Sequence, residues 1–258
     1  ADALGVAIVD AGRDYEPYAK QRDAAVAEAL VRSGRTLVLH REHVIFDGDE
    51  VLSKAGRPYT VFTPYRNAWL RRLDETGVPS FDSGTASLTP PPVASGVPAL
   101  AEIGFGESAR FDLAAGCVVP GMHGAAERLD DFRERMLRYA EQRDYPAVKG
   151  VSYLSVHLRF GTVSIRQLVR EALTIGGAGG MTWLSELVWR DFYFMILDRF
   201  PHAVTASFRP EYDAIVWEEW PQGLRAWQEG RTGYPLVDAA MRQLASSGYM
   251  HNRLRMVA

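Results

Sequence analysis

Residues 183–194, WLSELVWRDFYF, decide how the second half of this chain folds. Glu186, Trp189, Arg190 and Tyr193 stand at i, i+3, i+4 and i+7, which predicts a single stripe of an α-helix. A guanidinium suits a phosphate, an indole offers a stacking surface, and a carboxylate accepts hydrogen bonds from amide or imide groups. The alternative is a surface Arg–Glu pair beside two core aromatics, and such pairs are common.

The segment YMHNRLRM near the C-terminal end has the same character. Asn252, Arg255 and Met256 share one face of the predicted helix, while Arg253 points elsewhere. One guanidinium could then meet a ligand and the other a second anionic partner; the alternative is a helix with solvated arginines. We interpret His251 as a hydrogen-bonded structural histidine and expect no metal site, because no second ligand stands at a suitable spacing.

Helical patterns surround these two segments. They predict helices at 125–142, 164–173, 180–198, 222–229 and 235–258. The last pattern is still running at Ala258, so we expect the chain to end inside an element.

The N-terminal residues alternate strand and helix patterns, which is typical of a parallel α/β layer. The predicted elements are a strand at 5–10 buried on both faces, a helix at 14–33, strands at 35–40 and 42–46, and a helix capped by Thr63 that runs from Pro64 to Leu73. Two or three strands make a narrow sheet, so we interpret this α/β domain as partial.

A Pro-, Gly-, Ser- and Thr-rich stretch that includes Thr89–Pro92 separates the two halves. It predicts an extended connector. We therefore predict three parts: a partial α/β domain at 1–75, a linker at 76–124 and a helical domain at 125–258.

Composition excludes several classes of protein. The chain of 258 residues is 47% hydrophobic and 24% charged, which excludes disorder, collagen and coiled coil as descriptions of the whole. No apolar run approaches the roughly 20 residues of a membrane span. The single Cys117 cannot build a disulfide framework, so we expect a reducing, cytoplasmic compartment. The net charge of −3 means that any anion-binding surface must be a local patch.

The stretch GVSYLS at 150–155 joins two helical patterns. Its hydroxyl groups and backbone N–H groups could cradle a phosphate, with Tyr139 and Arg143 beside it, or form a plain turn. No Walker loop, dinucleotide fingerprint, nucleophile elbow or glycosidase-like carboxylate pair accompanies it. Hydrolase chemistry has no visible nucleophile.

Five motifs, taken in order, resemble the DNA photolyase/cryptochrome family over nearly the whole chain. They are VFTPYRNAWL (61–70), YAEQRDYPAVKGVSYLSVHLRFGTVS (139–164), WLSELVWRDFYFMIL (183–197), AWQEGRTGYPLVDAAMRQL (226–244) and GYMHNRLRM (248–256). The resemblance implies an α/β antenna domain, a connector and a helical domain that holds FAD. It also implies an enzyme whose photoexcited reduced flavin donates an electron to a pyrimidine dimer that has left the DNA stack.

The resemblance also implies roles for individual residues. The cofactor set is Tyr139, Ser152, Tyr153, Leu154, Ser155, Trp183, Arg190, Asn252 and Arg255. The residues implied at the dimer or in electron transfer are Glu186, Trp189, Asn252, Met256 and, as the surface tryptophan of the electron chain, Trp217. The residues implied at DNA are Arg143, Glu186, Trp189, Tyr193, Asn252 and Arg253.

Within the family, Met256 favours the cyclobutane pyrimidine dimer photolyases of the class I type, because other branches place His or Gln there. The alternative is a cryptochrome-type photoreceptor without repair activity. Val151 and Tyr249 depart from the family's commoner Thr and Trp. The resemblance also implies that the family's first and last elements are missing, so we expect these 258 residues alone to bind FAD poorly.

The expected partners are FAD, UV-damaged DNA and a second antenna chromophore, a folate or a deazaflavin, whose identity the sequence leaves open. We expect a monomer with no membrane partner.

Overall fold

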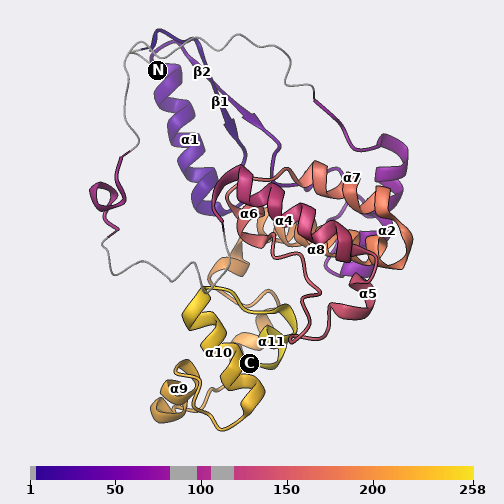
Figure 1. Ribbon diagram of the computed structural model, residues 1–258. Helices are drawn as coiled ribbons and strands as arrows, with labels where there is room; N and C mark the ends of the chain where they lie inside the picture. The colour runs from indigo at the N-terminus through magenta and orange to yellow at the C-terminus, as the bar shows by residue number, and fades with distance from the viewer. Residues whose placement is uncertain (1–3, 82–97, 106–118) are drawn as a thin grey trace. The chain divides into compact units, whose positions relative to one another are not determined.

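The computed structural model describes residues 4–81, 98–105 and 119–258 (Figure 1). The chain divides into two compact units: unit 1 joins Ala1–Pro92 with Leu158–Ile215, and unit 2 joins Val93–His157 with Val216–Ala258. These units follow packing, whereas the three-part division at 75 and 124 follows composition and stays a prediction. Thr89–Pro92 and Cys117 lie outside the described residues.

A small parallel sheet opens unit 1. Strand β1 (Ile8–Gly12) pairs with β2 (Thr36–His40), with Ile8 opposite Thr36 and Gly12 opposite His40. Helix α1 (Pro17–Arg32) connects the two strands and packs against β2 (Figure 1). This strand–helix–strand order confirms the predicted parallel α/β layer.

Three local predictions in this region are wrong. The first strand begins at Ile8, and the 56% exposure of this side chain contradicts burial on both faces. Residues 42–46 form no strand, because the N–H groups of Ile45 and Phe46 donate to a carboxylate on α8. Helix α2 (Phe62–Thr76) begins one residue before Thr63, whose side chain makes no capping hydrogen bond.

The helical part of unit 1 packs around one long helix. Helix α8 (Gly177–Arg199) contacts both α2 and α7 (Ile165–Ile175). Gly180 permits the approach of α7, since a Cβ atom there would lie 2.6 Å from the carbonyl oxygen of Ala172. The 3₁₀ helices η4 (Pro201–Val204) and η5 (Pro210–Ala214) follow α8. Trp69, Leu168 and Val188, one from each main helix, are fully buried.

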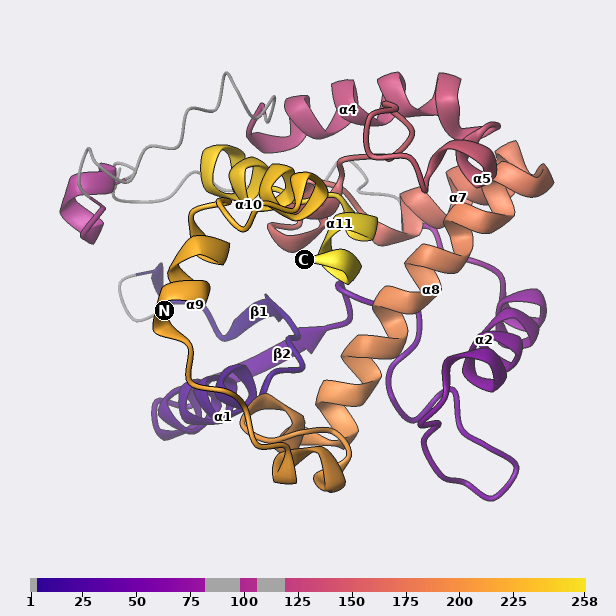
Figure 2. The same ribbon diagram turned by 90° about the horizontal axis from the view of Figure 1, so that it is seen from below.

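Unit 2 is built from short helices, several of them visible at the yellow end of the chain in Figure 2. Its helices are η2 (Leu100–Ile103), α4 (Gly121–Met136), α5 (Tyr139–Gln142), α9 (Pro221–Gln228), α10 (Pro235–Ser247) and α11 (Asn252–Val257). Helix α6 (Ser155–Arg159), which the sequence did not predict, starts in this unit and ends in unit 1.

Two predicted helices of unit 2 are each broken in two. The pattern at 125–142 divides into α4 and α5 around Leu137. The pattern at 235–258 divides at Gly248, whose φ of 68° ends α10 in the left-handed conformation that glycine adopts without strain. The apolar spacing survives the break, because Met241 on α10 and Leu254 on α11 enter the same small core.

Among the described helices, none has both the length and the apolar character needed to cross a bilayer.

Candidate functional site

Trp189 lies in a stack of aromatic rings on the surface of unit 1. Its ring centroid is 3.5 Å from that of Phe62, at an interplanar angle of 7°, and 5.5 Å from that of Tyr193, at 22°. Phe62 is the first residue of α2, so the packing of α2 on α8 fixes the orientation of the indole. Tyr193 is 59% exposed and forms the outer end of the stack. The structure therefore brings together two of the residues implied at DNA.

Arg190 turns away from this stack toward the loop after β2. Its Nη1 donates to the carbonyl oxygen of His43, and its Nη2 lies 3.4 Å from Nδ1 of the same histidine. The guanidinium carbon also lies 4.6 Å from the ring centroid of Phe194. The predicted stripe is thus divided, with Trp189 and Tyr193 on one side and Arg190 with Phe194 on the other.

The guanidinium of Arg190 fits an anionic ligand. Burial lowers its pKa, and the negative charge of Asp191 opposes that shift. No carboxylate in the described part of the chain forms a salt bridge with it, since its hydrogen-bond partners are atoms of His43. A half-buried cation without a salt-bridge partner is suited to an anion, and a diphosphate would compensate its charge. This arrangement fits the FAD role implied by the resemblance.

Asp191, which sequence reasoning missed, holds this region together. Its Oδ2 accepts from the N–H of Ile45 at 2.9 Å, from that of Phe46 at 3.4 Å and from Nε1 of Trp69 at 3.0 Å. Burial raises the pKa of this carboxyl group to about 6, although these hydrogen bonds oppose the shift. The available signal was its place on the apolar stripe that includes Leu184 and Val188.

The two remaining α8 residues differ in exposure. Trp183 is buried, at 3% exposure, whereas Glu186 is half-buried. All five predicted α8 residues therefore belong to one helix of unit 1, and the roles assigned to them stay predictions.

In unit 2, Asp144 brings two of the predicted DNA-contacting arginines together. Its Oδ1 accepts from Nε of Arg253 at 2.7 Å and lies 3.4 Å from Nε of Arg143. Hydrogen bonding from Arg253 holds the pKa of Asp144 below its usual range. The guanidinium of Arg143 lies 5.4 Å from the ring centroid of Tyr139, which is buried.

The loop before α6 and the first residue of that helix contain four more of the predicted cofactor residues. Tyr153 has a φ of 55°, in the left-handed region that residues other than Gly, Asn and Asp rarely adopt. Its ring centroid lies 5.2 Å from that of Tyr249. Oγ of Ser152 accepts from the N–H of Leu154 at 3.4 Å, while Ser155 is exposed at the first position of α6.

Helix α11 is positioned by its N-terminal cap. Nδ1 of His251 accepts from the N–H of Arg253 at 3.2 Å, and this confirms a structural role for that buried histidine. Arg255 donates from Nε to the carbonyl oxygen of Met250 at 3.1 Å, and Asn252 is exposed.

One prediction about α11 is wrong. Arg253 was expected to point away from Met256, but its Nη1 lies 3.4 Å from the sulfur of that methionine. The cause is the length of the arginine side chain, which reaches along the helix to the residue three positions on.

Trp217 is 79% exposed in the segment between η5 and α9. Its role in an electron-transfer chain stays a prediction. Within the described residues there is no group of three or more His, Cys, Asp or Glu side chains that could hold a metal ion.

Two family models match the chain. Residues 1–86 match DNA photolyase, and residues 183–258 match the FAD binding domain of DNA photolyase. The second match covers α8 from Trp183 onward and all of α11, the two helices that carry most of the predicted site residues.

Comparison with individual proteins gives the same result. The chain is 35% identical over 260 residues to the deoxyribodipyrimidine photo-lyase of a Synechococcus species, and the match covers 95% of this chain and 53% of that relative. The crystal structure of a class III photolyase from Agrobacterium tumefaciens matches with a TM-score of 0.82 and 30% identity, covering 98% of this chain and 53% of that one. An archaeal photolyase from Sulfolobus tokodaii, solved with two FAD molecules, matches with a TM-score of 0.72 and 28% identity, covering 98% and 53%. The chain spans about half the length of the relatives it matches.

Proposed function

This chain belongs to the DNA photolyase family, and from that premise we propose that the protein uses light to repair cyclobutane pyrimidine dimers in DNA. When bound, reduced FAD would supply the electron that splits the dimer after absorbing blue or near-UV light. The protein's own residues must bind the flavin, admit the damaged bases and hold them. A lesion has to leave the duplex stack before such chemistry can reach it.

The observation that carries the proposal is the arrangement of side chains on α8. Trp189 is held between Phe62 and Tyr193, and the stack ends at the exposed ring of Tyr193, so this edge of the stack offers an aromatic surface to flipped-out bases. Glu186 stands one helical turn away, where its carboxylate can accept a hydrogen bond from a pyrimidine imide or amino group. Arg190, on the other side of the helix stripe, offers its guanidinium to the FAD diphosphate.

The residues of unit 2 supply the complementary functions. The loop at 152–155 offers hydroxyl and N–H groups to a phosphate, and Arg143 and Arg253 offer paired cations to DNA phosphates. Asn252, Arg255 and Met256 stand on the helix matched by the FAD-binding model. These assignments come from the motif resemblance. The residues at these positions of unit 2 carry chemical groups that suit the assigned roles.

The test is repair of a defined lesion by the natural full-length protein. An oligonucleotide with one thymine dimer is incubated with the FAD-loaded, reduced protein under blue light, and dimer loss is followed by chromatography. We expect light-dependent loss of the dimer that slows at least tenfold in Glu186→Gln. The matched control is Glu141→Gln, an exposed carboxylate on α5.

Two outcomes would contradict the proposal. Failure of the illuminated protein to remove dimers overturns it. Light-dependent binding of a protein partner without dimer loss would instead favour the cryptochrome-type alternative. The class I subtype and the second chromophore stay predictions alongside this proposal.

A further inference from the structure

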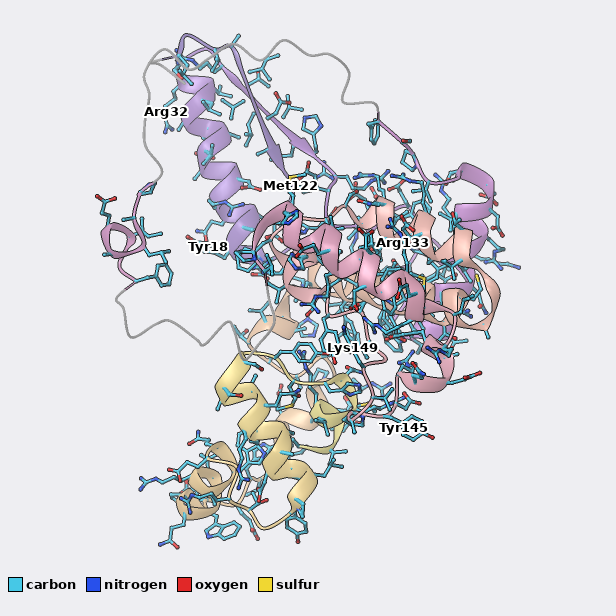
Figure 3. All side chains as sticks on the ribbon, in the orientation of Figure 1. Tyr18, Arg32, Met122, Arg133, Tyr145 and Lys149 are labelled. Carbon is cyan, nitrogen blue, oxygen red and sulfur yellow. The ribbon has the colours of Figure 1, made fainter. Side chains whose placement is uncertain are left out.

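Arg135 of α4 binds the loop at 149–155 by its main chain. Its Nη1 donates to the carbonyl oxygen of Lys149 at 2.7 Å and to that of Val151 at 3.0 Å. The side chain of Arg135 is only 13% exposed, so water competes poorly for these two hydrogen bonds. Both carbonyl groups lie within three residues of Ser152, the first of the four loop residues implied at FAD, and that of Val151 directly precedes it. Figure 3 shows Lys149 on this loop and Arg133 on the neighbouring α4.

Asp131, one turn earlier on α4, holds Arg135 in place. Oδ2 of Asp131 accepts from Nη2 of Arg135 at 2.7 Å, and its Oδ1 accepts from Nζ of Lys149 at 2.7 Å. Burial acts to raise the pKa of Asp131, but the hydrogen bonds from Lys149 and Arg135 bring it below its usual value. The carboxylate thus remains charged and links the helix to the loop at two points.

The loop backbone is held close to its surroundings. A Cβ atom on Gly150 would lie 2.7 Å from the carbonyl oxygen of Gln142, so only glycine fits against the end of α5. Three residues later, Tyr153 adopts its left-handed φ of 55° with its ring 5.9 Å from the guanidinium of Arg128. Such a conformation persists only where the neighbouring structure imposes it.

We propose that Arg135 is a positioning residue for FAD: it fixes the loop in the conformation in which Ser152–Ser155 receive the diphosphate. This inference rests on the proposed function, because the cofactor role of the loop comes from that assignment. Arg135 touches the loop by two carbonyl groups and reaches FAD only through it. A loop already ordered before binding loses little conformational entropy when the ligand arrives, and this increases affinity.

The chemistry of the contact calls for arginine. A guanidinium has five N–H donors in one plane, so it can bind two carbonyl oxygens and a carboxylate at once. A lysine at the same position has one nitrogen on a flexible stem. Arg135→Lys should therefore restore part of what Arg135→Met removes, whereas a role that depends on charge alone predicts full restoration.

The experiment measures FAD affinity and loop order in the natural full-length protein. We expect Arg135→Met to raise the dissociation constant of FAD about tenfold and Arg135→Lys to raise it about threefold. Without FAD, trypsin should cut between Lys149 and Gly150 about ten times faster in Arg135→Met, as mass spectrometry of early fragments would show. Arg138→Met removes the same charge from the exposed residue immediately before α5, and it should leave both quantities unchanged.

Each result decides the inference. Unchanged FAD affinity in Arg135→Met overturns it, and so does weaker affinity without faster cleavage at Lys149. If Arg135→Met fails to fold, the lysine variant alone decides, because full wild-type affinity there excludes a geometric role. Failure of the proposed function looks different: wild-type protein that binds FAD and repairs no dimer overturns repair while the effect of Arg135 on FAD affinity remains.

Discussion

The predicted site residues of unit 1 and unit 2 are held in contrasting ways. On α8, the consecutive residues Trp189, Arg190 and Asp191 are each held by partners far away in sequence, on α2 and on the loop after β2. On α11, Arg253 and Arg255 are held by neighbours within five residues, apart from the contact of Arg253 with Asp144. The geometry of α8 thus depends on tertiary packing, whereas that of α11 depends mainly on how the short helix begins.

The contrast predicts that Asp191 carries the largest effect on stability. Asp191→Ala leaves the N–H groups of Ile45 and Phe46 and the indole of Trp69 without their acceptor, at a cost of about 3–5 kcal/mol in the free energy of unfolding. Urea unfolding would measure it. Asp198→Ala, on the same helix but paired with the exposed Lys20, should cost about 1 kcal/mol or less. Equal losses in the two variants would show that Asp191 has no special role.

The same carboxyl group gives a signed pH dependence. Its folded-state pKa of about 6 lies above the ordinary aspartate value of 3.8, so the native state binds more protons than the unfolded state between these values. The stability that this shifted pKa contributes is fully present below about pH 4 and is lost as the pH rises to about 6. The free energy of unfolding should fall by on the order of 3 kcal/mol in all. In Asp191→Asn this fall in the free energy of unfolding should be absent. Urea unfolding of the wild type and of the variant at pH 4.5 and at pH 7 would measure the difference. A fall of the same size in Asp191→Asn would contradict this assignment.

The next effect concerns the aromatic stack. Phe62→Leu keeps an apolar side chain but removes the flat ring against Trp189, so the indole loses its fixed orientation. An aromatic pair contributes about 0.5–1.5 kcal/mol, and we expect affinity for a dimer-containing oligonucleotide to fall about fivefold. Affinity for undamaged duplex should not change. Tyr59→Leu, which removes a ring packed on Tyr65, is the control; an equal loss in that variant would show a general packing effect.

The N-terminal cap of α11 should have a smaller effect on stability than Asp191. Its contribution should also change with pH in the opposite direction. His251→Ala removes the acceptor for the N–H of Arg253 and should cost about 1 kcal/mol, whereas His251→Asn can keep the cap. Burial lowers the pKa of His251, so its contribution to stability is present above the unfolded pKa and is lost as the pH falls through the folded pKa. Thermal unfolding of the alanine and asparagine variants from pH 7.5 down to pH 5 would measure both. Equal destabilisation by the two substitutions would contradict the capping role.

The two units also differ in how well the sequence predicted them. Periodicity predicted α8 and its polar residues, because a helix places residues on its faces by spacing alone. It could not show that Arg190 and Trp189 turn to different partners, since His43 and Phe62 reach them only through the tertiary fold. For the same reason residues 42–46 suggested a strand, although Asp191 supplies the acceptor that a strand neighbour would have provided.

In unit 2 the errors were local. The apolar spacing around Gly248 predicted the correct core residues but joined α10 and α11 into one helix. A glycine in the left-handed conformation ends the helical hydrogen bonds but preserves the spacing of the apolar residues. The pattern alone therefore cannot distinguish one continuous helix from two helices separated by such a glycine. The resemblance of motifs identified the loop at 152–155, whereas the role of Arg135 required coordinates, because main-chain carbonyl groups have no signature in sequence.

The smallest expected effect tests the ion pair that Arg253 of α11 makes with Asp144. Asp144 accepts from Arg253 and lies beside Arg143. The side chains of Arg253 and Asp144 are 38% and 49% exposed, so this pair contributes at most about 1 kcal/mol to stability. Asp144→Asn removes a negative charge from between two cations proposed to face DNA phosphates. Affinity for a short duplex should rise about two- to threefold at low salt, and the gain should shrink as added salt screens it. Asp130→Asn, which removes a carboxylate paired with Arg133 on α4, should have no such effect. Weaker DNA binding by Asp144→Asn would contradict this expectation. It would mean that orienting Arg253 toward DNA is the main effect of the Asp144 carboxylate, and that neutralising the charge of Arg253 is the lesser one. The geometry of α11 would then depend on tertiary contacts, as that of α8 does.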